Sequence, residues 1–196
     1  FLFLLSIFSI TKAETIVMMY ESMKIKAFII LFAFTGILIG QSGASLTGEL
    51  KKWHKVTLQF EGGAFDESGV ENPFLEYRLN VTFTNGAKTY LVPGFFAADG
   101  NAAESSASKG KIWQVRFVPD EEGEWSYSVS FRKGKNIAVE EDPKAGEPVM
   151  FDGASGKFSV LASDKTGRDF RSKGRLKYTG ERYLKFAETN KAFLKG

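Results

Sequence analysis

Apolar and polar residues alternate strictly along much of this sequence. In WQVRF, the apolar residues Trp113, Val115 and Phe117 are separated by single polar residues. The same period recurs in the stretches VTLQF, YRLNVTF and WSYSVSF. A period of two places one face of a strand on a core and the other face in water. The alternation therefore predicts antiparallel strands with one buried face, and no segment between them has a long helical period.

Turn-forming residues separate these strands. Asn85-Gly86 stands directly between two alternating runs and is the strongest hairpin signal. Further turns are indicated at Asp99-Gly100, Gly134, Asp142-Pro143 and Asp152-Gly153. About seven short strands over about 110 residues are typical of an immunoglobulin-like antiparallel β-sandwich. We predict this all-β fold, with a closed barrel as the alternative that periodicity leaves open.

The N-terminal region looks like a targeting segment. Within 23–44, a short basic start precedes the apolar run AFIILFAFTGILIG, and Ser42 and Ala44 are the small residues before a cut at Ser45. This pattern predicts the helix of a secretory signal peptide, which is too short for a stable membrane anchor. Residues 1–22 lack an initial Met and are interpreted as an upstream extension of the reading frame, or else as a second apolar element. We expect a secreted or periplasmic protein.

Charge divides the rest of the chain in two. Residues 45–163 hold 13 Lys and Arg against 17 Asp and Glu, a net charge of −4, whereas residues 164–196 have 10 against 4, a net charge of +6. We place the sandwich at 45–163 and a linker at the start of 164–196. The stretch GRLKYTGERYLKF predicts a small hairpin in this tail. Because about 33 residues cannot bury a core, we expect the tail to begin a following domain that is truncated here.

The charged and reactive residues exclude several classes of function. A net charge of +3 is too small and too scattered to argue for nucleic acid. The chain has no Cys and one His, His54, so thiol chemistry, disulfides and multi-His metal sites are excluded. We expect no metal and no cofactor. A basic run in the tail could contact an acidic polymer or form a solvated linker: Arg168, Arg171, Lys173, Arg175 and Lys177.

The stretch VRFVPDEEGEWSYSVSF contains a cluster of acids between aromatic residues. The acids are Asp120, Glu121, Glu122 and Glu124. Catalysis of sugar cleavage needs two carboxylates held across a cleft by rigid elements, and neighbours in one turn splay apart. Pro119 and Gly123 instead supply the fixed and the permissive backbone of a tight corner. We interpret the acids as a solvated turn, with calcium binding as the alternative, and assign no catalytic residue.

Aromatic residues are the other candidates for a binding site, because exposed rings can stack on sugars. Trp113 and Trp125 are in phase with the apolar faces of their strands and are predicted to lie in the core. Trp53 precedes the first long strand and has no clear phase, so it is a candidate ligand contact. Phe95 and Phe96 are consecutive, so one of them should face outward. These three residues are our candidate ligand-binding set.

One group of residues resembles a known family. Its F-x-P-(x)3-G-x-W-x-Y skeleton consists of Phe117, Pro119, Gly123, Trp125 and Tyr127, which we take as a structural signature. The stretches ELKKWHKVTLQFEG, NPFLEYRLNVTF and FDGASGKFSV are also similar. The chain thus resembles domain of unknown function 5060, the N-terminal immunoglobulin-like domain of secreted bacterial glycoside hydrolases. The resemblance covers about 48–160, and the tail resembles the segment that leads into the catalytic (β/α)8 barrel.

The resemblance implies a non-catalytic accessory domain of a polysaccharide-degrading enzyme. Such a domain would pack against or position the catalytic barrel, and the catalytic acids would lie in that barrel, outside this chain. The fragment itself would then not be an enzyme, although its parent would. Two alternatives remain: a carbohydrate-binding module that uses exposed aromatics, and a self-contained enzyme. The missing pair of facing carboxylates argues against the second of these.

Overall fold

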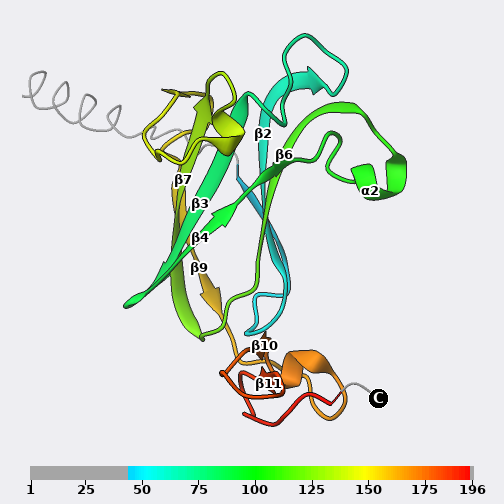
Figure 1. Cartoon of the computed structure of the whole chain (residues 1–196), viewed down its shortest axis with the longest axis vertical. Coiled ribbons are helices and arrows are strands. Elements are labelled where there is room, and N and C mark those ends of the chain that lie inside the picture. The colour runs from blue at the N-terminus through cyan, green and yellow to red at the C-terminus, as the bar shows by residue number, and fades with distance from the viewer. Residues whose placement is uncertain (1–43, 195–196) are drawn as a thin grey trace, which may run out of the picture. The chain divides into compact units, whose positions relative to one another are not determined.

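The structure is a computed structural model that describes residues 44–194. The predicted signal peptide and upstream extension lie outside the described residues. Within 44–194, none of the helices has the length and apolar character needed to cross a membrane. The described part consists mainly of antiparallel strands (Figure 1).

The first sheet has four strands in the order β1-β2-β6-β5, all paired antiparallel. Its strands are β1 (Ser45–Gly48), β2 (Val56–Asp66), β5 (Phe95–Phe96) and β6 (Lys109–Phe117). The pairing of β2 with β6 shifts between Glu61 and Phe65. This irregularity bends the far end of β2, while its first half keeps a regular inward and outward alternation.

The second sheet follows the order β4-β3-β7-β8, with β9 also paired to β7. Its strands are β3 (Tyr77–Asn85), β4 (Lys88–Pro93), β7 (Gly123–Lys133), β8 (Glu147–Pro148) and β9 (Ser155–Val160). The predicted hairpin is confirmed, because Asn85 pairs with Lys88 across a two-residue loop. Gly86 in this loop has φ of 55°, a value that glycine adopts without strain.

The core lies between the two sheets and is rich in aromatic rings. Phe83 of β3 stacks on Phe117 of β6 with ring centroids 4.2 Å apart, which joins one sheet to the other. Trp113 of β6 packs edge-on against Phe131 of β7, with ring centroids 4.7 Å apart, and this contact also joins the two sheets. Trp113 and Trp125 are buried, as their phase predicted. Two sheets facing each other across one core confirm the antiparallel β-sandwich and not the barrel (Figure 1).

The connections contain short helical turns that the sequence pattern did not indicate. The loop between β5 and β6 holds a single turn, α2 (Ala102–Ser105), and a 3₁₀ turn, η1 (Ile137–Val139), follows β7. Each is too short to show a helical period. Their formation depends on local backbone hydrogen bonds, such as that from Ser105 to the carbonyl of Asn101.

The C-terminal segment folds around its own small aromatic cluster. It contains a 3₁₀ turn, η2 (Phe170–Ser172), and the antiparallel strands β10 (Leu176–Lys177) and β11 (Lys185–Phe186). The predicted tail hairpin is thus confirmed, although a seven-residue loop joins its strands. The rings of Phe170 and Phe193 both lie 5.7 Å from that of Phe186.

Candidate functional site

Trp53 joins the C-terminal segment to the end of the sandwich. Its indole Nε1 donates a hydrogen bond to Glu188 Oε2 at 3.0 Å, and Lys52 Nζ donates to Glu188 Oε1 at 2.9 Å. The Lys52 ammonium holds the pKa of the Glu188 carboxyl below its usual value. Gly174 packs directly on the indole, since a Cβ added there would lie 2.9 Å from Trp53 Cε2. We call these four residues the Trp53 clamp.

The clamp leaves Trp53 only 9% exposed. Solvent exposure, on which its candidacy for ligand contact rested, is therefore absent. The sequence could not decide this, because Trp53 has φ of 65° and stands outside the alternation of β2. Its backbone N–H donates to the Pro119 carbonyl at 2.8 Å, which fixes the unusual turn against the β6–β7 corner.

That corner is built around a buried carboxylate. Asp120 is 8% exposed, so the prediction that all the acids of this stretch face water is wrong for this residue. Tyr90 donates its hydroxyl to Asp120 Oδ2 at 2.6 Å, and Lys88 Nζ lies 3.3 Å from the same oxygen. Burial alone raises the pKa of the Asp120 carboxyl, but these two contacts outweigh it and hold the pKa below its usual value.

The remaining features of the corner match the predicted turn. Gly123 has φ of 100°, and Pro119 is fully buried. Glu121 pairs with Lys88 at 2.6 Å and Glu124 pairs with Lys157 at 2.8 Å, so these acids neutralise the charges of lysines on neighbouring strands. Of the signature residues, Trp125 and Phe117 are core, while Tyr127 is only half buried against it.

Ion pairs extend the contact between the tail and the corner. The Arg175 guanidinium lies 4.0 Å from Asp120 Oδ2 and 5.9 Å from the centre of the Tyr90 ring. Arg175 comes directly after Gly174 of the clamp. The buried carboxylate and the clamp therefore hold adjacent residues of the same tail segment.

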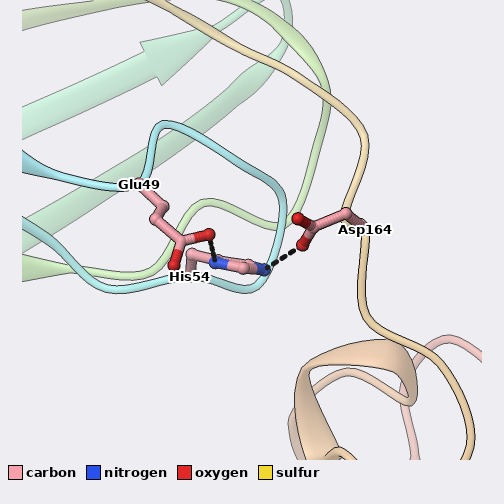
Figure 2. A group of neighbouring side chains, drawn as sticks. All are labelled: Glu49, His54 and Asp164. Carbon is pink, nitrogen blue, oxygen red and sulfur yellow. Dashed lines mark ion pairs between the residues drawn. The ribbon is translucent and has the colours of Figure 1, made fainter.

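His54 occupies the centre of a second contact between the sandwich and the tail (Figure 2). The imidazole is 2% exposed. Its Nδ1 lies 3.0 Å from Glu49 Oε2, and its Nε2 lies 3.9 Å from Asp164 Oδ1 and 3.2 Å from the Ser163 hydroxyl. The contact at Nδ1 is short but is not a hydrogen bond. It therefore brings charge close to the ring without fixing its tautomer.

The atoms of Glu49, His54 and Asp164 that could bind a metal lie within 4.8 Å of one another. Their arrangement nevertheless does not suit one metal ion. The two carboxylates face different nitrogens of the same ring, so an ion bonded to one nitrogen would lie away from the acid at the other (Figure 2).

Two lysines also form ion pairs with these carboxylates. Lys51 lies 2.6 Å from Asp164 and Lys165 lies 3.1 Å from it, and both also approach Glu49. Their ammonium groups hold the pKa of the Asp164 carboxyl far below its usual range. Lysines that already neutralise both acids oppose a bound cation. We interpret the group as an ionic contact that joins the loop after β1 to the start of the tail.

Phe95 and Phe96 point in opposite directions, as consecutive strand residues must. Phe96 is buried, whereas Phe95 is 38% exposed. Phe95 lines a cleft of about 270 Å³ together with Phe74, which the sequence analysis did not select and which is 51% exposed. The Arg116 guanidinium lies 5.1 Å from the centre of the Phe95 ring. The aromatic cleft is thus the part of the sandwich where exposed rings gather.

Part of the sandwich matches a known protein family. Residues 49–132 match the family described as domain of unknown function (DUF5060). The resemblance stated from the sequence is confirmed over these residues. The DUF5060 match runs from Glu49, through the clamp residues Lys52 and Trp53, to Arg132 near the end of β7. The tail half of the clamp lies outside the match.

The comparisons with solved structures and with curated proteins are less informative. A crystal structure of a putative glycoside hydrolase from Bacteroides vulgatus ATCC 8482 is similar to 75% of this chain, with 23% sequence identity and a TM-score of 0.48. The chain covers 21% of that protein, about a fifth of its length. No curated protein matches this chain.

Proposed function

We propose that residues 45–163 are a non-catalytic domain of a secreted glycoside hydrolase that acts on polysaccharide. In this proposal, the DUF5060 sandwich packs against or positions a catalytic barrel in the same full-length protein. Two findings support it. The sandwich matches a family that occurs, by the resemblance described above, at the N-terminus of such enzymes. The clustered acids Asp120, Glu121 and Glu124 bind side chains of neighbouring strands and so contribute to the fold.

The Trp53 clamp is the observation that carries the positioning role. A flexible linker would let a following domain move freely. Here the sandwich contacts the tail through the buried Trp53 indole and through the ion pairs of Lys51 with Asp164 and of Lys52 with Glu188. Gly174 lies so close to the indole that a Cβ added there would be 2.9 Å from Trp53 Cε2, which leaves the tail backbone little room to shift. A domain that follows such a tail would be less free to move relative to the sandwich than a domain on a flexible linker.

Deletion from the full-length parent tests this role. Removing residues 45–163 should lower the yield and melting temperature of the parent much more than the rate constant of the folded remainder on a soluble substrate. A milder variant, Trp53→Ala, should loosen the connection while leaving the catalytic domain intact. Unchanged yield and melting temperature in both proteins would overturn the proposal.

The aromatic cleft favours a second candidate, a carbohydrate-binding module. The exposed rings of Phe74 and Phe95 flank a cleft of about 270 Å³, and exposed rings stack on the apolar faces of sugars. Isothermal titration against neutral polysaccharides should then give heat that Phe95→Ala abolishes. Leu91→Ala, which changes an exposed apolar residue of β4 outside the cleft, is the control. A panel without heat would exclude this role.

A further inference from the structure

A second cleft, of about 530 Å³, lies entirely within the C-terminal segment. Three lysines line it, Lys165, Lys173 and Lys191, and no acidic residue does. Thr166 and Thr189 add hydroxyl groups to the lining, whereas the Ser172 hydroxyl already donates to the Asp169 carbonyl at 2.6 Å. Its size lies in the range of small-molecule sites. The lining therefore offers many donors and no negative charge.

The tail's own acids do not neutralise this cleft. The segment 164–196 has four acids, and each is engaged by a basic partner. Those pairs are Asp164 with Lys51 and Lys165, Asp169 with Arg171, Glu181 with Lys185, and Glu188 with Lys52. Within residues 44–194, Lys173 and Lys191 have no carboxylate within ion-pair distance, although Lys165 does. Two ammonium groups thus face the cleft without a counter-charge.

The position of Lys173 is set by packing. Its Nζ lies 5.6 Å from the centre of the Phe170 ring and 5.4 Å from that of Phe186. Contact with two aromatic rings restricts a side chain that would otherwise be mobile. Phe186 also forms part of the cleft wall, next to Ala192. The cleft therefore combines an apolar wall with a positioned cation.

We propose that this cleft binds a carboxylate-bearing saccharide, such as a segment of a uronic acid polysaccharide. The apolar wall at Phe186 and Ala192 suits the C–H face of a sugar ring, and the hydroxyl side chains suit its hydroxyl groups. Lys173 and Lys191 suit the carboxylate. The choice of a polysaccharide as ligand rests on the proposed function. If the parent is a polysaccharide hydrolase, a tail that binds acidic polysaccharide would keep the enzyme close to its substrate.

Titration of the purified protein with a trigalacturonate tests the proposal, with a neutral trisaccharide of the same length as the comparison. We expect binding of the acidic sugar only, and weaker binding as salt is raised. Lys191→Ala should reduce affinity about tenfold, the usual worth of one charge-assisted hydrogen bond. Lys173→Ala should do the same or more. Lys135→Ala, an exposed lysine in the turn after β7, should leave affinity unchanged.

Because Lys173 also packs on two rings, its variant could unfold the tail, so Lys191→Ala carries the test. Melting temperatures of all variants separate lost binding from lost structure. No binding of trigalacturonate, or binding that Lys191→Ala leaves intact, would overturn the proposal. Equal binding of inorganic phosphate or polyglutamate would overturn the saccharide assignment. These outcomes are independent of the deletion test of the sandwich, so either proposal can fail alone.

Discussion

The indole of Trp53 donates its hydrogen bond to Glu188, a residue 135 positions later in the chain. This bond joins the turn before β2 to the loop after β11, and it crosses from the acidic part of the sequence to the basic part. It is one of several contacts that hold the tail against the sandwich, together with the ion pairs of Lys51 with Asp164 and of Arg175 with Asp120.

Replacing Trp53 with Ala should cost about 3–5 kcal/mol of unfolding free energy, as for other buried aromatic residues. The loss combines the buried indole surface with the hydrogen bond to Glu188. Urea denaturation followed by circular dichroism measures it. Glu188→Gln is the milder comparison and should cost under about 1 kcal/mol, because the Glu188 side chain is 41% exposed. A loss of less than about 1 kcal/mol for Trp53→Ala would contradict the clamp.

Gly174 and Gly180 form a matched pair, with φ of 78° and 80°. Replacing either with Ala introduces the same backbone strain, about 1–2 kcal/mol. Only at Gly174 does the added methyl group meet the indole of Trp53, whereas nothing lies within 4 Å of it at Gly180. Gly174→Ala should therefore cost about 1–3 kcal/mol more than Gly180→Ala.

The same pair of variants can be compared by limited proteolysis. A loosened tail should be cut faster in Gly174→Ala than in Gly180→Ala, with cleavage within 164–196. Equal stabilities and equal cleavage rates for the two variants would show that the packing of Gly174 on the indole contributes nothing.

Acid should weaken the protein partly through Asp120. The folded-state pKa of this carboxyl is lowered, so its contribution to stability is present above about pH 4 and is lost as the pH falls through the folded pKa. The unfolding free energy should therefore fall as the pH drops below about 4. Asp120→Asn should be less stable at pH 7 and show a shallower acid dependence. Glu122→Gln, which changes an exposed acid of the same turn, should reproduce the original curve.

Export provides a test of the N-terminal prediction. Expression in a bacterium with a periplasm should yield a mature protein whose first residue is Ser45, because Ser42 and Ala44 have the small side chains that signal peptidase requires. N-terminal sequencing of the periplasmic fraction measures this directly. Replacing Ala44 with a bulky residue should retain the signal peptide. Mature protein that begins before residue 23 would exclude the proposed start.

The alternation of side chains predicted the strands and the core with few errors. Val115, Phe117 and Trp125 are buried because a strand with one face on a core has no other way to satisfy that pattern. The Asn85-Gly86 hairpin was equally predictable, since its turn chemistry is local. The division at 163–164 stays a prediction, although the charge difference that suggested it is real.

The candidate site was predicted less well. The consecutive aromatics Phe95 and Phe96 gave one exposed ring, but its partner Phe74 lies outside any strand and carried no periodic signal. Trp53 is a candidate from the sequence because it stands outside the alternation of the strands. Its burial depends on Gly174 and Glu188. The sequence offers one sign of a role for Glu188, which is the single acid between Lys185 and Lys191.

The acidic stretch shows the same division. Sequence alone determined that Pro119 and Gly123 make a corner and that the flanking aromatics enter a core, because those properties belong to each residue and its neighbours. The burial of Asp120 against Tyr90 and the covering of Trp53 by the tail follow from tertiary contacts, which the sequence pattern does not contain. Burial of these two residues is set by partners more than 25 positions away. No local pattern encodes which distant surface will cover a side chain.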